Sequence, residues 1–236
     1  MKRSGGTDAQ KRRAGEHAAD VVSDGDVVGL GTGSTAGAAI RALGRRVDAG
    51  LDVRGIATSH QSRALAREAE IPLTTHEDAT PDIAIDGADL VAGVDGGESI
   101  DLIKGGGAAH ASEKVTAVAA ERFIIVADPT KLAERLDIPV PIEVLAGAVP
   151  VVERELSALG GTPTLRAAER KDGPVVTDNG NLVIDCGFGE LEDPELLAAE
   201  LAFLPGVVEH GLFVGLADEV YIGTDDGVDV HHANSQ

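Results

Sequence analysis

The sequence contains few residues of several kinds, and each shortage excludes a class of protein. Its one cysteine, Cys186, excludes an internal disulfide framework. No stretch approaches the roughly 20 apolar residues that a membrane-spanning helix needs. Residues 1–13 contain no apolar run that would serve as a signal peptide. We therefore expect a cytoplasmic protein with no membrane attachment.

Lysines and aromatic rings are also scarce. Only six residues are lysines, and 40 Asp and Glu against 20 Lys and Arg give a net charge of −20, which argues against nucleic acid as a partner. Aromatic residues make up 2% of the chain, so the core must be built from Ala, Val, Leu and Ile. An acidic surplus with few lysines predicts halophilic adaptation, because high salt screens the self-repulsion.

Helical and strand patterns alternate through the first part of the chain. Apolar spacing predicts helices over 10–22, 35–47, 61–70 and 108–122, and short apolar runs predict strands over 27–30, 53–57, 82–85 and 123–126. Strands that alternate with helices predict an α/β fold with a parallel sheet.

The pattern changes beyond Leu136, where three prolines bound shorter elements. An Asn-Gly pair within 175–184 predicts a β-hairpin, and 194–203 reads as a helix. These elements indicate a second, α+β unit.

Residues 220–222 read as a late strand that returns to the first sheet. We therefore predict two domains. The larger comprises residues 1–135 together with 208–236, and the smaller comprises 136–207.

A glycine loop, Gly31-Thr32-Gly33-Ser34-Thr35, joins the first predicted strand to the next helix. Glycines let the backbone approach an anion, a helix start supplies unpaired N–H groups, and the hydroxyls add donors. The loop therefore suits a phosphate. Two alternatives stay open: Gly31-x-Gly33-x-x-Ala36 also fits a dinucleotide fingerprint, and Ser34 fits a helix N-cap.

Asp86-Gly87-Ala88-Asp89 directly follows an apolar strand. Two carboxylates three residues apart on a tight turn can face one cleft, where their proximity separates their pKa values and suits acid–base work. The alternative is a turn with a helix-capping Asp.

Lys104-Gly105-Gly106-Gly107 leads into an Ala-rich helix that carries Glu113. Consecutive glycines indicate a close approach of the backbone to a ligand or another strand. Alanine neighbours place Glu113 beside an apolar face, where desolvation raises its pKa and allows proton exchange near neutrality. The alternative is a solvated Glu paired with a Lys or Arg.

Lys131 closes the segment Ala127-Asp128-Pro129-Thr130-Lys131 and offers a cation at the end of a buried strand. A solvated lysine is the alternative. All four segments follow a predicted strand or begin a helix, which is where open α/β sheets gather their ligands.

Together, these segments resemble the motif set of the type A ribose-5-phosphate isomerases in order and spacing: GTGSTA at 31–36, DGAD at 86–89, KGGGAA with EK within 104–114, and ADPTK at 127–131. Residues 141–144, 177–180, 204–208 and 223–228 extend the likeness over nearly the whole chain. The resemblance implies a Rossmann-like parallel-sheet domain with a smaller ferredoxin-like α+β domain.

The resemblance also implies an activity, the interconversion of D-ribose 5-phosphate and D-ribulose 5-phosphate through an enediolate, in the non-oxidative branch of the pentose phosphate pathway. It implies no cofactor and no metal, and a homodimer or homotetramer. Glu113 is the implied base, with Asp86, Asp89 and Lys104 around the reacting carbons. The implied substrate-binding residues are Thr32, Gly33, Ser34, Thr35, Asp86, Gly87, Ala88, Asp89, Lys104, Gly105, Gly106, Gly107 and Lys131.

Two rival functions make predictions that the sequence does not meet. A dinucleotide-dependent oxidoreductase needs an acidic residue at the end of the second strand, where this chain has Ala57-Thr58-Ser59-His60. A sugar-phosphate-sensing regulatory domain needs an attached DNA-binding segment and positive charge, and the sequence has neither.

A metal-assisted isomerase is a third rival. His110-x-x-Glu113 has ligand spacing on a helix, and His231-His232 form a pair in what reads as a frayed tail. No third and fourth ligand lie nearby in sequence, so we predict no metal site.

Overall fold

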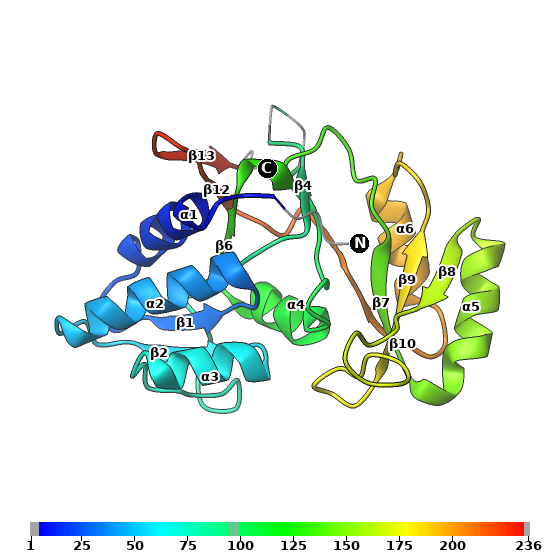
Figure 1. Cartoon of the computed structure of the whole chain (residues 1–236), viewed down its shortest axis with the longest axis horizontal. Coiled ribbons are helices and arrows are strands. Elements are labelled where there is room, and N and C mark those ends of the chain that lie inside the picture. The colour runs from blue at the N-terminus through cyan, green and yellow to red at the C-terminus, as the bar shows by residue number, and fades with distance from the viewer. Residues whose placement is uncertain (1–4, 95, 97–98, 234–236) are drawn as a thin grey trace.

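The computed structural model describes residues 5–94, 96 and 99–233, and Figure 1 shows its sheets side by side. The first sheet has six strands in the order β13-β12-β6-β3-β1-β2. Five of them run parallel and only β13 is antiparallel, which confirms the parallel α/β sheet. The strands are β1 (Val27–Leu30), β2 (Arg54–Ala57), β3 (Ile83–Asp86), β6 (Arg122–Ala127), β12 (Glu219–Gly223) and β13 (Val228–His232).

Helices α1 (Asp8–Asp20), α2 (Ser34–Asp48), α3 (His60–Glu68) and α4 (His110–Ala119) pack against this sheet. Small residues let α1 and α2 approach closely, because a Cβ built on Gly15 would lie 2.5 Å from the Ala39 nitrogen. The core beneath them consists mainly of Ala, Val, Leu and Ile side chains, as the shortage of aromatic rings predicts.

The second sheet has four antiparallel strands in the order β10-β7-β9-β8. Its chain order is β7-α5-β8-β9-α6-β10, the ferredoxin-like arrangement. Buried leucine and valine side chains of both helices pack on β7 and β9. The elements are β7 (Val140–Val144), α5 (Val149–Ala158), β8 (Thr162–Leu165), β9 (Leu182–Gly187), α6 (Pro194–Ala202) and β10 (Val207–His210).

A third sheet, in the order β11-β5-β4, connects the two units. It comprises β4 (Leu90–Ala92), β5 (Asp101–Ile103) and β11 (Leu212–Val214). Successive side chains on a strand point to opposite faces. Leu90, Ile103 and Leu212 therefore join the core of the second sheet, whereas Val91, Leu102 and Phe213 join the core of the first. The sequence patterns predict none of these three strands.

The prediction that residues 175–184 form a hairpin of two paired strands is wrong. The turn exists, since the Gly180 N–H donates to the Thr177 carbonyl at 2.9 Å. However, Val176 and Leu182 form only an isolated bridge. The reason is that β9 already pairs with β7 on one edge and β8 on the other.

The predicted late strand is confirmed as β12, which lies next to β6 in the first sheet. The predicted domain boundary between residues 207 and 208 falls inside β10, whose residues pair with β7. A division that follows the sheets ends the smaller unit at His210, and the two-domain division itself stays a prediction. The helices that the structure describes are all too short or too polar to span a lipid bilayer.

Candidate active site

A cavity of about 490 Å³ lies where the loops after β1, β3 and β6 meet the first turn of α4. All four segments singled out in the sequence contribute to it. Of the expected site residues, only Asp86 is not in its lining, and Asp86 contacts the lining residue Lys104 directly. The expected residues that line it are Thr32, Gly33, Ser34, Thr35, Gly87, Ala88, Asp89, Lys104, Gly105, Gly106, Gly107, Glu113 and Lys131.

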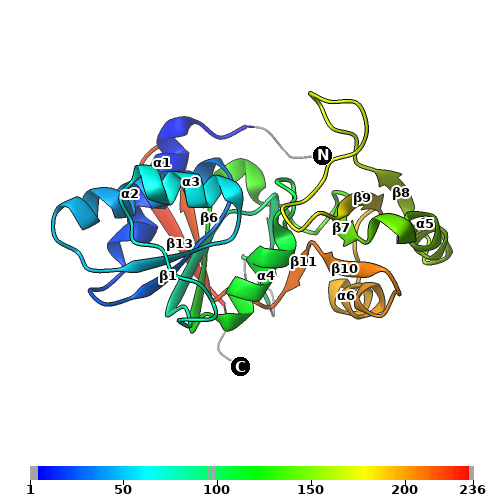
Figure 2. The same cartoon turned by 90° about the horizontal axis from the view of Figure 1, so that it is seen from below.

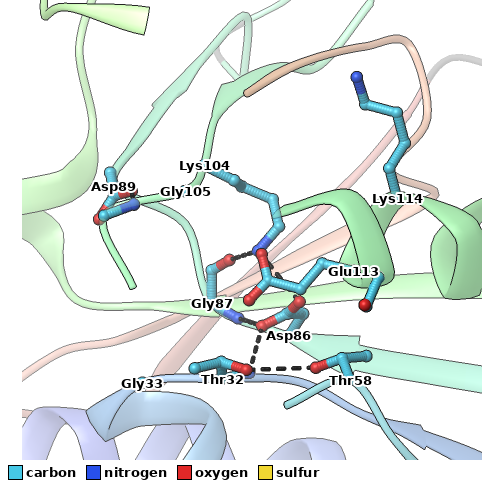
Figure 3. A network of polar contacts seen from close by, with 12 residues as sticks. Thr32, Gly33, Thr58, Asp86, Gly87, Asp89, Lys104, Gly105, Glu113 and Lys114 are labelled. Atoms are coloured by element: carbon cyan, nitrogen blue, oxygen red, sulfur yellow. Dashed lines mark hydrogen bonds and ion pairs between the residues drawn. The ribbon is translucent and has the colours of Figure 1, made fainter. Parts of the chain in front are cut away.

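Three buried charges meet at one end of this cavity (Figure 3). The Lys104 Nζ lies 3.0 Å from a carboxylate oxygen of Asp86 and 3.0 Å from one of Glu113. It also donates to the Gly87 carbonyl at 2.5 Å. Each of the three charged side chains comes from a different element, since Asp86 ends β3, Lys104 follows β5 and Glu113 lies in the first turn of α4. The contacts bring an acid, a cation and a second acid within reach of one bound molecule.

This environment sets the proton affinity of Glu113. Burial and the nearby charge of Asp86 raise its pKa to about 7, while Lys104 acts in the opposite direction. Burial lowers the pKa of Lys104, but the two carboxylates outweigh it and raise that pKa above its ordinary value. The site therefore holds a permanent ammonium ion beside a carboxyl group that exchanges protons near neutrality.

Asp86 is anchored from its other side by the backbone. Its Oδ1 accepts the Thr32 N–H at 2.9 Å and the Gly87 N–H at 2.7 Å. Burial raises its pKa, and Lys104 with these N–H groups opposes the rise. A Cβ on Gly31 would lie 2.0 Å from the same Oδ1, so the first glycine of the loop makes room for this carboxylate. Asp86 therefore fixes the backbone of its turn and also contacts Lys104.

Asp89 lies on the opposite side of Lys104 in Figure 3. Its Oδ2 accepts the Gly106 N–H at 2.6 Å. Antiparallel pairing of β4 with β5 sets Leu90 opposite Ile103 and so brings the residues next to them, Asp89 and Lys104, to the same end of the pair. A Cβ on Gly106 would meet Asp89 at 2.6 Å, so the close backbone approach predicted for the glycines is to this carboxylate.

The other end of the cavity lies at the start of α2. The alternative interpretation of Ser34 as the N-cap is wrong, because α2 begins at Ser34, its N-cap is Gly33 at φ 106°, and no described side chain caps it. The N–H groups of the first turn therefore have no side-chain cap, as at the helix N-termini that bind anions. The Thr32 hydroxyl is not among the donors facing the cavity, since it donates to Ser59 Oγ at 2.7 Å.

Lys131 ends the short 3₁₀ helix η1 (Pro129–Lys131), and its side chain is buried at the cavity wall. Three other polar residues in the wall, Lys11, Gln61 and Asp128, are absent from the sequence-based site. No motif contains Lys11, which comes from α1, and only the scarcity of lysines would have drawn attention to it.

The histidines considered as metal ligands lie in ordinary structural positions. His110 is fully buried, its Nε2 lies 3.3 Å from the Glu209 carbonyl, and burial lowers its pKa to about 3. His231 and His232 do not form a frayed tail, because they pair with β12 as part of β13. Within residues 5–94, 96 and 99–233, no three His, Cys, Asp or Glu side chains are grouped to hold a metal ion.

The chain is similar to known proteins over almost its whole length. The model of the family described as ribose 5-phosphate isomerase A (phosphoriboisomerase A) matches residues 54–227. A ribose-5-phosphate isomerase A of Natronomonas pharaonis is 72% identical over 98% of this chain and 100% of its own length. One of Haloarcula marismortui is 62% identical over 97% of each chain. Both relatives come from halophilic archaea.

Solved structures agree with these relatives. Ribose 5-phosphate isomerase A of Methanocaldococcus jannaschii is 43% identical, with a TM-score of 0.89 over 94% of this chain and 97% of that one. A D-ribose-5-phosphate isomerase in complex with phospho-erythronic acid is 40% identical, with a TM-score of 0.90 over the same shares. The fold, the sequence and the converging motifs agree, and the chain belongs to the ribose 5-phosphate isomerase A family.

Proposed function

We propose that the chain interconverts D-ribose 5-phosphate and D-ribulose 5-phosphate through an enediolate, with Glu113 as the base that moves the proton. Membership of the family supports the reaction. The observation that carries the assignment of Glu113 is its buried carboxyl group, 3.0 Å from the Lys104 ammonium and with a pKa raised to about 7. A base with a pKa near the working pH suits general acid–base catalysis.

The proton transfer is balanced within the sugar. Ionised Glu113 takes the proton from C2, the C–H electron pair becomes the C1–C2 double bond, and the carbonyl oxygen on C1 gains negative charge. The C2 hydroxyl gives up its proton to the oxygen on C1, and as the C2 oxygen becomes the new carbonyl Glu113 returns the carbon-bound proton to C1. One carboxylate serves both transfers because C1 and C2 are adjacent.

Lys104 stabilises the charge that develops on the two oxygens. Its ammonium group is held by Asp86, Glu113 and the Gly87 carbonyl before any substrate arrives, so little reorganisation accompanies the reaction. One donor placed in this way contributes about 3 kcal/mol to the transition state. We assign Asp86 to opening the furanose ring and to moving hydroxyl protons, and Asp89 to holding the sugar hydroxyls beside it.

The phosphate is assigned to the other end of the cavity. The backbone N–H groups and hydroxyls of Ser34 and Thr35 lie at the positive end of the α2 dipole. Lys131 and Lys11 add cations from two other elements. The related enzyme in complex with phospho-erythronic acid supports a sugar phosphate as the ligand.

The rest of the proposal follows from the family and from the sequence. We assign no metal ion or cofactor to the reaction, a cytoplasmic location, and a homodimer or homotetramer. The proton transfer described above requires nothing besides the side chains of this chain.

A direct assay tests the function. Purified protein, dialysed against EDTA, is mixed with ribose 5-phosphate in concentrated KCl, and ribulose 5-phosphate is measured. We expect ribulose 5-phosphate to form at a rate that added divalent metal does not change. No conversion would contradict the function, and activity that depends on added metal would contradict the proposed mechanism.

A further inference from the structure

Arg166 belongs to the second unit and lies just after β8. Its Nη1 donates to the Gly105 carbonyl at 2.8 Å, with a longer contact of 3.5 Å to the Gly106 carbonyl. The side chain therefore reaches out of its own unit to the glycine loop of the candidate active site.

Arg166 is itself held in a fixed orientation. The Asp185 carboxylate on β9 accepts two hydrogen bonds from its guanidinium group, at 2.8 Å from Nε and 2.5 Å from Nη2. A planar guanidinium and a carboxylate joined by two parallel bonds form a rigid pair. Only 16% of the Arg166 side chain and 26% of the Asp185 side chain are exposed, so water screens the pair weakly.

The peptide group between Gly105 and Gly106 connects Arg166 to the cavity. Its carbonyl accepts from Arg166, and its N–H donates to Asp89 Oδ2 at 2.6 Å. The peptide group thus lies between a cation at one end and a carboxylate at the other. Because a peptide group is planar, fixing its carbonyl also fixes the direction of its N–H.

Gly105 makes this peptide group easy to misplace. It has φ +105°, a conformation that favours glycine, and the two glycines after it add little restraint. Rotation of the peptide group would break the bonds to Arg166 and Asp89 together. The Ala108 N–H also donates to the Gly105 carbonyl, at 2.9 Å, but this bond lies within the loop and does not tie it to another element.

We propose that Arg166, held by Asp185, is a positioning residue that orients Asp89 through the Gly105–Gly106 peptide group. The second unit thereby sets the geometry of a site built on the first. This inference rests on the role proposed above for Asp89. A misplacement of about 1 Å in a catalytic group lowers the rate by about 100-fold.

The test is a double-mutant cycle. We expect Arg166→Met to lower kcat/KM by about 10- to 100-fold and Arg166→Lys to lower it less, because lysine keeps one donor. In an Asp89→Ala background, Arg166→Met should lower kcat/KM by less than about threefold, since the group that it orients is gone. Losses that multiply in the double variant would overturn the inference, and so would an Arg166→Met enzyme with wild-type kinetics.

A second pair of variants keeps the test independent of folding. Asp185→Asn keeps the shape of the Asp185 side chain but weakens its hydrogen bonds to Arg166, so kcat/KM should fall several-fold. This loss should again disappear in the Asp89→Ala background. Arg135→Met is the matched control, because Arg135 contacts only the exposed Glu190 at 3.4 Å among the ion pairs of the described residues. It should leave kcat/KM unchanged. A wild-type rate for Asp89→Ala would instead contradict the proposed role of Asp89.

Discussion

The two ends of the cavity are built on different physical principles. Asp86, Lys104 and Glu113 form what we call the reaction end, where every charged side chain is at least 95% buried and touches an opposite charge. The phosphate end, formed by Ser34, Thr35, Lys11 and Lys131, offers N–H groups and cations, and Ser34 there is exposed. Burial of all three charges makes the first end sensitive to protonation, whereas the role proposed for the second end is to bind an anion. Substitutions at the two ends should therefore change different kinetic constants.

The largest effect is expected from Glu113→Gln, which keeps the shape of the reaction end and removes its base. Turnover should fall by about 10²- to 10⁴-fold with folding retained. Glu121→Gln is the matched control, because Glu121 is exposed just beyond α4 and should tolerate the change. Steady-state kinetics and circular dichroism provide the measurements. A Glu113→Gln enzyme with wild-type turnover would end the proposed mechanism.

Lys104→Met should lower kcat by about 10²- to 10³-fold, the usual effect of losing one donor to developing negative charge. Lys104→Arg should not restore the rate, since a wide planar group replaces a compact ammonium held by three partners.

The same variant tests the electrostatics. Glu113 must be ionised to act as a base, so wild-type kcat/KM should fall as the pH drops through about 7. Lys104 lowers the pKa of Glu113. Removing it should raise that pKa and move the acidic limb of the Lys104→Met profile to higher pH. An unmoved limb would show that the two groups are not coupled.

At the phosphate end, Lys131→Ala should raise KM about 10-fold and leave kcat nearly unchanged, because a contact to the phosphate is made equally in the ground and transition states. Lys11→Ala should behave in the same way. Lys171→Ala, at an exposed site, is the control. A fall in kcat at constant KM would instead place Lys131 near the reacting carbons and remove the contrast between the two ends.

The smallest effect is expected from salt, because salt acts on the whole surface and not on one end of the cavity. The quantity that it should change is the melting temperature. With a net charge of −20, the folded chain should melt at a higher temperature in molar KCl than in dilute buffer. Thermal unfolding followed by circular dichroism tests this. A melting temperature that does not change with salt would contradict halophilic adaptation.

The two ends also differ in how well the sequence predicts them. The part of the phosphate end at the start of α2 follows a strand–loop–helix pattern, so the first residue of that helix could be predicted within one position, whereas Lys11 could not be predicted. At the reaction end, the motifs identified Asp86, Lys104 and Glu113 but not their contacts. Lys104 comes to the same end of the strand pair as Asp89 because β4 and β5 pair in antiparallel register.

Strands as short as β4 and β5 have no detectable period. Their third partner, β11, comes from residues 212–214, after the second unit, so this pairing depends on contacts remote in sequence. Arg166 could not be predicted for the same reason, because its partners on the glycine loop lie about 60 positions away in the sequence. Local pattern thus predicted every strand of the first sheet except β13, whereas long-range packing set the geometry of the charges.

The most direct test of the reaction end is the titration of Glu113 itself. The protein is labelled with ¹³C at glutamate carboxyl groups, and the Glu113 resonance is assigned as the signal that the Glu113→Gln variant lacks. We predict a titration midpoint of about 7, set by burial and Asp86 against the opposing effect of Lys104. A midpoint near the ordinary value of 4.5 would contradict the assignment of Glu113 as the buried base.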